Sequence, residues 1–428
     1  MREMKDSGIS WVGEIPTNWT IGRIGGLYSL RNQKVSDKDY EPLSVTMKGV
    51  LPQLETAAKT NDGDNRKLVR KGDFAINSRS DRRGSCGIAD RDGSVSLINT
   101  ILKPRNQMNA RYYNWLFHTP MFADEFYKWG HGIVDDLWST NWEEMKKIQI
   151  PFPSLVEQQR IAEFLDRECG KIDGLKADIQ AQIDTLEQYK RSVITEAVTH
   201  GLNPSAPMKD SGISRVGDIP QNWKIKRLKY LFKFCKGLPI TKDNLIDQGL
   251  PVISYGQIHA KTNNGVDVRP HLLRFVDFSY QTFYPLSQVM RGDFVFADTS
   301  EDYEGCGNCV YKRNDSLLFA GYHTIIAHSI VESDNRFFAY LFQTDIWRKQ
   351  IREKVSGVKV FSITQKTLSN TYLILPPLDE QQEIADYLDN KCAEIEGIIE
   401  DKKSQIETLD GYKKSLIYEY VTGKKEVV

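Results

Sequence analysis

Hydrophobic residues recur every three or four positions in two long stretches of the chain, Glu157–Ala197 and Glu380–Tyr420. The recurring apolar residues are Ile161, Leu165, Ile172, Leu175, Ile179, Leu186 and Val193 in the first stretch, and Ile384, Leu388, Ile395, Ile398, Leu409 and Leu416 in the second. This spacing forms one apolar stripe on an α-helix, with a period close to the heptad of a coiled coil. Each stretch has 41 residues and no proline, which predicts a helix about 60 Å long. Because each stripe needs a partner of equal length, we expect the two helices to pair in an antiparallel coiled coil.

The remainder of the chain has the pattern of mixed α and β structure. Short runs rich in β-branched and aromatic residues, separated by Gly, Asp and Asn, predict strands. These runs are Phe74–Ile76, Ser96–Ile98, Pro251–Tyr255, Phe294–Ala297 and His323–His328. One helix is expected at Ala110–Tyr127 and another at Asn335–Lys354. Proline-containing hinges at Pro151–Pro153 and Pro376–Pro377 then precede the two long helices.

The chain is a tandem duplication. The 25 residues that begin at Met4 and the 25 that begin at Met208 are identical at 16 positions. The similarity returns in the motifs Lys71–Phe74 and Arg291–Phe294 and again in the long helical stretches. We therefore expect two copies of one unit that are alike in these motifs and differ in sequence between them, joined by a linker at 203–207.

Composition narrows the class of protein. The chain has 428 residues with 40% hydrophobic and 11% aromatic residues, values typical of a folded protein with several domains. Six scattered cysteines and the absence of a long apolar run or signal sequence lead us to expect a cytoplasmic protein with no membrane partner. The net charge is zero, but the two helical stretches carry 11 basic and 20 acidic residues, against 46 and 37 elsewhere. A basic excess outside the helices favours a polyanionic partner.

Three motifs, each present in both copies, carry a resemblance to a known family. They are the GEIPTNW and GDIPQNW openings, the KGDF and RGDF runs, and the EQQ-x-IA-x-x-LD segment that follows each hinge. The layout resembles the specificity subunit of Type I restriction-modification systems. In the first copy PFPSLVEQQ stands where the second has PPLDEQQ.

The resemblance implies an α+β fold with four parts. They are target recognition domain 1 at 1–150, repeat helix 1 at 151–203, target recognition domain 2 at 204–375 and repeat helix 2 at 376–428. It implies that each domain reads one half of a split, asymmetric target in double-stranded DNA, and that the helices set the spacing and dock two methyltransferase subunits. Whether two restriction subunits also bind stays open. The subunit itself would be bacterial or archaeal, non-catalytic and without a cofactor, because S-adenosylmethionine and ATP would bind the partner subunits.

Candidate DNA contacts follow from residue chemistry. Arginine can pair with guanine, asparagine with adenine, and Lys or Arg with phosphates. In the first domain the polar run after a predicted strand supplies Asn77, Ser78, Arg79, Arg82 and Arg83, and a second segment supplies Thr46 and Lys48. The matching run in the second domain, Asp298–Glu304, is acidic, so we expect readout there to shift to Tyr255, Gln257, His259 and Lys261, which align with Thr46 and Lys48, or to Lys359.

Other signals have simpler interpretations. Cys306, Cys309, His323 and His328 come near the spacing of a zinc site, but the two histidines fall in a predicted strand, so we expect no metal. Neither a phosphate loop nor a methyltransferase tetrapeptide occurs in the sequence, and we expect no catalytic residues. Tyr189 and Tyr412 are interpreted as packing in the helical seam, and Gln158 and Gln381 as helix caps or partner contacts. A structural scaffold and a self-contained enzyme remain alternatives to a DNA-reading subunit.

Overall fold

The protein is represented by a computed structural model that describes residues 2–53, 62–105, 108–132, 138–213, 216–357 and 360–427. The chain divides into two compact units. Unit 1 comprises Met1–Gln180 and Lys402–Val428, and unit 2 comprises Ala181–Asp401. Helix α5 (Leu155–His200) begins in unit 1 and ends in unit 2, whereas helix α11 (Leu378–Val421) begins in unit 2 and ends in unit 1.

Unit 1 is built around a four-stranded antiparallel sheet of order β10-β9-β12-β4, beside a three-stranded sheet β11-β8-β5. The pairs β1-β2, β6-β7 and β13-β3 complete it. The strands are β1 Met4–Asp6, β2 Glu14–Pro16, β3 Thr20–Arg23, β4 Tyr28–Arg31, β5 Lys34–Val35, β6 Leu43–Thr46, β7 Gly49–Pro52, β8 Arg66–Val69, β9 Phe74–Asn77, β10 Cys86–Ile88, β11 Gly93–Val95, β12 Asn99–Pro104 and β13 Gln149–Phe152. The short helices are α1 Ile24–Leu27, α2 Ala110–Phe117, α3 Pro120–Lys128 and α4 Trp142–Met145.

Unit 2 repeats this plan. Its four-stranded sheet has the order β17-β24-β20-β22, and the pairs β14-β15 and β16-β26 correspond to β1-β2 and β3-β13. Its strands are β14 Met208–Asp210, β15 Asp218–Pro220, β16 Lys224–Arg227, β17 Phe232–Lys236, β18 Leu250–Ile253, β19 Arg274–Val276, β20 Phe294–Ala297, β21 Thr299–Ser300, β22 Cys309–Tyr311, β23 Phe319–Ala320, β24 Thr324–Ser329, β25 Phe361–Ser362 and β26 Tyr372–Leu375. Its short helices are α6 Tyr255–Ile258, α7 Ser279–Phe283, α8 Asn335–Leu341, α9 Asp345–Arg352 and α10 Gln365–Ser369.

Several sequence predictions of local structure need correction. The single helices expected at Ala110–Tyr127 and Asn335–Lys354 are each two helices, α2 with α3 and α8 with α9. The breaks arise because Thr119 and Thr344 accept hydrogen bonds from backbone N–H groups of the following helices as N-caps. Ser96–Ile98 is not a strand but connects β11 to β12, and His323 precedes β24 rather than belonging to it.

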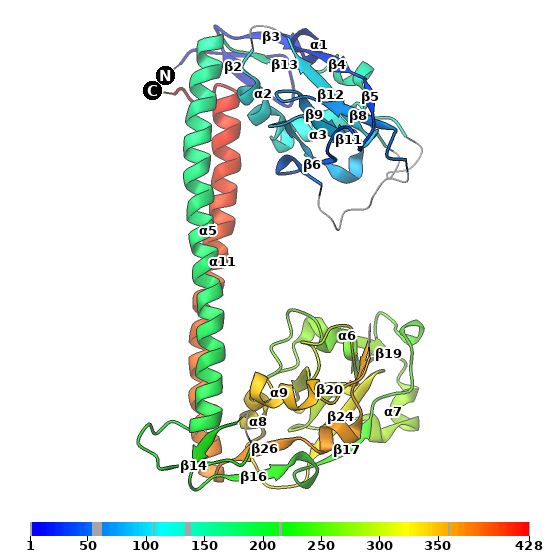
Figure 1. Ribbon diagram of the computed structural model, residues 1–428, viewed down its shortest axis with the longest axis vertical. Coiled ribbons are helices and arrows are strands. Elements are labelled where there is room, and N and C mark those ends of the chain that lie inside the picture. The colour runs from blue at the N-terminus through cyan, green and yellow to red at the C-terminus, as the bar shows by residue number, and fades with distance from the viewer. Residues whose placement is uncertain are drawn as a thin grey trace. The chain divides into compact units, whose positions relative to one another are not determined.

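The paired long helices are present as the sequence predicts (Figure 1), and each extends beyond the predicted stretch. Their buried and half-buried residues alternate in steps of four and three, which is a heptad seam. The seam residues are Leu165, Cys169, Ile172, Lys176, Ile179, Ile183, Leu186, Lys190, Val193 and Ala197 on α5, and Leu388, Cys392, Ile395, Ile399, Lys402, Ile406, Leu409, Lys413, Leu416 and Tyr420 on α11.

The helices run antiparallel in each unit. In unit 1 the ring of Phe164 packs on Tyr420, with 4.3 Å between ring centroids, and further along α5 Asp173 accepts a hydrogen bond from Lys413 over 2.7 Å. In unit 2 Lys190 forms an ion pair with Glu396. The last turns of α5 there share a hydrophobic core with the first turns of α11. Each globular part therefore has a helical base that is made from both long helices.

Two of the motifs found in both copies form a single contact in each unit. The buried indole of Trp19 donates from Nε1 to Glu157, 3.2 Å from both carboxylate oxygens. Trp223 and Glu380 make the same contact in unit 2. We call this contact the indole–glutamate tether. It fixes the opening motif of each copy to the first turn of a long helix, where a carboxylate also favours the helix dipole.

Glutamine and aspartate residues next to the tether hold the same helix. The side chain of Gln158 accepts from the backbone N–H of Asn109, and that of Gln381 accepts from the N–H of Asp334. Asp166 accepts from Arg111 and Trp115. Asp389 accepts from Arg313, Arg336 and Tyr340. The repeated EQQ and LD motifs therefore join the globular part to the helical base. The glutamines accept from N–H groups of the globular part and not of their own helices, so their interpretation as caps of the long helices is wrong.

Candidate nucleic-acid interface

In each unit two central strands of the sheet end side by side at one edge, and we call this edge the strand-end cleft. In unit 1 the register pairs Asn77 at the end of β9 with Asn99 at the start of β12. A cavity of about 550 Å³ opens there, lined by polar side chains that include Lys67, Ser78 and Arg79. Burial lowers the pKa of Lys67, whose ammonium donates to the carbonyl of Asn99 over 2.7 Å. The cleft thus combines positive charge with hydrogen-bonding groups.

The sequence-predicted residues of the loop after β9 have two different roles. Asn77 is buried, and its side chain accepts from the N–H of Arg79 over 3.0 Å. The Ser78 hydroxyl lies 2.8 Å from that of Thr100. The Tyr127 hydroxyl, whose pKa is raised by burial, donates to the carbonyls of Asn77 and Arg82. Asn77 therefore shapes the loop, and the exposed contacts are left to the arginines.

Arg79, Arg82 and Arg83 are all exposed but differ in their partners. Arg82 lies 3.5 Å from Asp81, and Arg83 lies 3.0 Å from Asp124. Exposed ion pairs of this kind contribute about 0–1 kcal/mol, so both arginines can exchange a carboxylate for a phosphate. Among the described residues the Arg79 guanidinium has no ion-pair partner. Arg79 also lines the cleft, which makes it the best placed of the three for a base edge.

Thr46 and Lys48 lie at the tip of the β6-β7 hairpin. The hydroxyl of Thr46 donates to the carbonyl of Gly49 and accepts from the N–H of Lys48, so it stabilises the turn. Lys48 is exposed. The expected alignment of this segment with Tyr255 is not reproduced in the local structure, because Tyr255 begins helix α6 rather than a hairpin.

The predicted residues of the second domain are partly committed to the fold. Gln257 caps helix α6 by accepting from the N–H of Ser254. His259 contacts the carbonyl of Thr299 through Nε2 over 2.8 Å and Asn308 through Nδ1. Tyr255 is half-buried and Lys261 is exposed. Lys359 lies outside the described residues.

The acidic loop of unit 2 carries less unpaired charge than its sequence suggests. Glu304 forms an ion pair with the buried Arg352 over 2.8 Å. Asp302 accepts from the backbone N–H of Gly305, and Asp298 contacts His323 over 3.1 Å. Three of its four carboxylates thus have partners in the same unit, but only that of Glu304 pairs with an arginine, so repulsion of phosphates is weakened at Glu304 alone.

Each unit also exposes hydrophobic side chains on one flank of the helical base. Leu175 and Tyr412 in unit 1 are 53% and 57% exposed, and Tyr189 and Ile398 in unit 2 are 49% and 40% exposed. The interpretation of the two tyrosines as seam residues is therefore wrong. All four residues directly precede a seam residue and occupy equivalent heptad positions, which lie on the same flank of an antiparallel pair.

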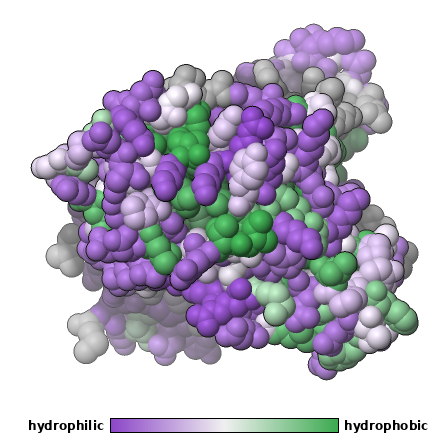
Figure 2. Space-filling view, turned by 90° about the horizontal axis from the view of Figure 1, so that it is seen from below, coloured by the Kyte–Doolittle hydropathy of each residue, from purple (hydrophilic) through white to green (hydrophobic). Residues whose placement is uncertain are grey.

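The opposite flank of the helical base is acidic. It carries Asp173 and Asp410, which pair with seam lysines in unit 1, and Glu396, which does so in unit 2. Asp166 and Asp389, which hold the globular parts, occupy the same heptad position on this flank. The hydrophobic pairs therefore lie on the flank away from the groups that attach the globular part. Figure 2 views the molecule from below. The face seen there is mostly hydrophilic, with hydrophobic side chains in small groups.

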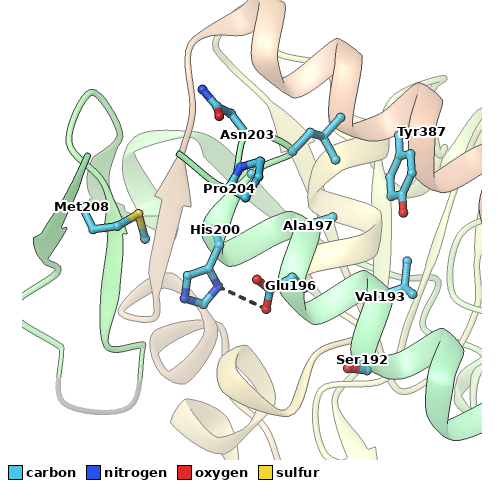
Figure 3. A pocket seen from close by; sticks show the side chains of 11 residues that line it. Ser192, Val193, Glu196, Ala197, His200, Asn203, Pro204, Met208 and Tyr387 are labelled. Carbon is cyan, nitrogen blue, oxygen red and sulfur yellow. Dashed lines mark ion pairs between the residues drawn. The ribbon is translucent and has the colours of Figure 1, made fainter. Parts of the chain in front are cut away.

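A further hollow of about 690 Å³ lies in unit 2 at the end of α5. Figure 3 shows Val193, Glu196, Ala197 and His200 from α5 on one side of it and Tyr387 from α11 on another, with His200 3.6 Å from Glu196. In the duplication Ala197 stands where the other copy has Tyr420. The hollow is thus the space that an aromatic ring fills in unit 1.

The part of the chain that the structure describes contains no group of three or more His, Cys, Asp or Glu side chains that could hold a metal ion. His328 of the zinc-like pattern instead lies 2.7 Å from Asp293. Among the described helices, none is long and apolar enough to cross a membrane.

Comparison with known proteins places this architecture in a family. Residues 16–185 and 220–408 both match the Type I restriction modification DNA specificity domain. The chain is 23% identical over 432 residues to the Type I restriction enzyme MjaVIII specificity subunit of Methanocaldococcus jannaschii, covering 96% of this chain and 94% of that protein. It is 25% identical over 246 residues to the EcoKI specificity subunit of Escherichia coli K12, covering 55% of this chain and 49% of that protein.

The fold is also that of a solved chain from work on complex assembly and conformational transition of the type I R-M system. That match has a TM-score of 0.71 and 14% sequence identity, and it covers 96% of this chain and 99% of the other. The two copies of the matched domain and the similarity along the whole chain lead to one conclusion: the protein belongs to the specificity subunits of Type I restriction-modification systems.

Proposed function

We propose that this chain is the non-catalytic DNA-reading subunit of its complex, with each globular part reading one half of a bipartite, asymmetric target. The observation that carries the proposal is the duplication itself. The tether and the central sheet are the same in both units, whereas the polar residues at the strand-end clefts differ. Arg79 stands in the cleft of unit 1, where unit 2 has Thr299. Two DNA-binding units with the same fold and different contact residues suit a DNA target whose two halves differ in sequence.

In both units, contacts between side chains and DNA phosphates would supply binding affinity. Contacts between side chains in the clefts and the edges of the bases would supply sequence preference. The exposed arginines after β9 and the exposed Lys48 and Lys261 are suited to phosphates because they carry mobile positive charge. The relatives named as specificity subunits support this assignment.

The helices would set the spacing of the half-sites and dock two methyltransferase subunits. The exposed pairs Leu175 with Tyr412 and Tyr189 with Ile398 are suited to this role, because they are equivalent under the duplication and can accept two copies of one partner. S-adenosylmethionine and ATP would then bind the partner subunits. A specificity subunit of this kind acts from the bacterial or archaeal cytoplasm, where its DNA lies.

Sequencing of modified bases tests the proposal. The chain is expressed with its methyltransferase subunit, and residues 1–150 are exchanged for the equivalent domain of another such subunit. One half of the methylated sequence should change, while the other half and the spacing stay the same. A change in both halves, or methylation without a bipartite sequence, would contradict the proposal. Steep loss of DNA affinity with added salt distinguishes a DNA reader from a protein scaffold.

A further inference from the structure

One residue of the strand-end cleft in unit 2 has an uncommon backbone conformation. His323 has φ of 55°, and it is the one non-glycine residue with positive φ among those that the structure describes. Such a conformation is strained for an ordinary side chain and persists only where the surrounding structure fixes it. It is found repeatedly at functional sites.

The turn before β24 is fixed from both sides. The N–H of Gly321 donates to the carbonyl of Ile253 over 2.7 Å, and the hydroxyl of Thr324 donates to the carbonyl of Gly321 over 2.6 Å. A Cβ atom at position 237 would overlap that same carbonyl oxygen, and Gly237 leaves it room. The turn therefore cannot relax without breaking the β18 and β17 contacts, and His323 is held in place by its neighbours.

The His323 ring is anchored at one nitrogen. Nδ1 lies 3.1 Å from Oδ1 of Asp298, the residue that follows β20. The ring of Tyr255 packs edge-on against it, with 5.4 Å between centroids. The His323 side chain is nevertheless 56% exposed. In the neutral ring, Nδ1–H donates to the carboxylate and Nε2 is an acceptor; Nε2 has no hydrogen-bond partner among the described residues.

We propose that His323 and Asp298 read a base in the half-site of unit 2 by accepting a hydrogen bond from its exocyclic amino group. The inference deepens the proposed function and rests on it. In the major groove the base-pair edges offer hydrogen-bond donors only at the amino groups of adenine and cytosine. Phosphates only accept, and a carboxylate would repel them. A pair of acceptors at this position therefore selects adenine or cytosine.

The other copy supports a reading role because it differs at these two positions. β9 pairs with β12 as β20 pairs with β24, so Asp298 corresponds to Ser78 and His323 to Ile98. The side chain of Ile98 is apolar, so this position of unit 1 offers no hydrogen-bond acceptor. The same backbone hydrogen bond joins the two positions in each unit, from the N–H of Ser78 to the carbonyl of Ile98 and from the N–H of Asp298 to the carbonyl of His323. The frame of the cleft is thus common to both units, and the polar pair is peculiar to unit 2.

The test maps methylated sites in cells that express the full chain with its methyltransferase subunit. His323→Gly removes the ring at a position whose φ suits glycine, and His323→Asn keeps a residue that tolerates positive φ. His328→Asn is the matched control, because His328 also contacts a carboxylate, that of Asp293, at the other end of β24. Thermal melting of the same proteins checks the fold.

His323→Gly should relax one adenine or cytosine position of one half-site, with discrimination falling about 5-fold to 150-fold. The other half-site should be unchanged, and His328→Asn should change neither. Unaltered discrimination in both His323 variants would overturn the inference, as would relaxation at a position read on guanine or thymine. Equal loss of base discrimination at both half-sites would overturn the inference too, because His323 would then act by stabilising the turn and not by contacting a base. A wild-type complex without sequence preference would instead contradict the proposed function.

Discussion

The tether between Trp223 and Glu380 gives the sharpest prediction of stability. The indole of Trp223 is fully buried, and Nε1–H donates to the carboxylate of Glu380 in the first turn of α11. Asn222 donates to the same carboxylate. Glu380→Ala removes the acceptor and leaves the Nε1–H of a buried side chain without its partner. We therefore expect unit 2 to lose stability although the substitution lies near the surface.

The size of the effect follows from two contributions. A buried donor left without a partner costs about 1–3 kcal/mol. Loss of a carboxylate from the first turn of a helix costs a further ~0.3–1 kcal/mol. Together they amount to roughly 2–3 kcal/mol at the centre of these ranges. For a unit of this size that lowers the melting temperature by about 4–12 °C.

A double-mutant cycle separates the hydrogen bond from everything else. Unfolding is followed by circular dichroism for wild type, Glu380→Ala, Trp223→Phe and the double variant. In the Trp223→Phe background the buried indole donor is absent, so Glu380→Ala should cost only the ~0.3–1 kcal/mol of the helix-dipole contribution and the contribution of the exposed Asn222 hydrogen bond. Glu380→Gln, which keeps an acceptor, serves as a control. The reasoning is refuted if Glu380→Ala costs the same in both backgrounds.

Three further predictions concern unit 1. Burial by itself would raise the pKa of Glu157, but hydrogen bonds from the indole and a guanidinium outweigh it and hold the pKa below 4.5. The stability from this contact is thus fully present above about pH 4.5 and lost as the pH falls through the lower folded pKa; Glu157→Gln should flatten that part of the acid dependence in urea titrations. Arg79→Ala should lower discrimination at one base about 5-fold to 150-fold if Arg79 reads a base edge, whereas a phosphate contact would reduce the salt slope of DNA binding by ~0.9 instead. Leu175→Lys, and separately Tyr412→Lys, should weaken binding of one methyltransferase subunit in native mass spectrometry without lowering the melting temperature. Gln405→Lys, which adds the same single charge at an equivalent exposed heptad position, should have no effect.

The sequence predicts the long helices well because their signal is repeated over many turns. One heptad stripe and a duplicate of it suffice to predict both helices and their pairing. The short elements depend on single residues instead. Thr119 followed by Pro120 is a helix start that the sequence displays, yet the apolar periodicity on both sides of it suggests one continuous helix. Heptad spacing alone also predicts Tyr189 to lie in the seam, because the spacing does not distinguish a seam position from the helix position next to it.

The candidate contacts are predictable only where one loop carries them. The arginines after β9 are adjacent in sequence, so their chemistry is visible before the fold is known. Asp298 and His323 are 25 residues apart and meet only because β20 pairs with β24 in one register. The positive φ of His323 depends on contacts with β17 and β18. No local pattern in the sequence reports either fact.

The duplication explains why the two kinds of residue are distributed as they are. Residues that join the globular part to the long helices are the same in both units: the tryptophan, glutamate, glutamine and aspartate each make equivalent contacts. A change in any of them would alter how a unit is mounted, and both units are mounted on the same pair of helices. The loops beside the central strands have no such role, and side chains there such as Arg79 and His323 are exposed. Sequence can therefore diverge at the clefts without affecting how each unit is attached, which is the distribution expected if the two units read different halves of a target.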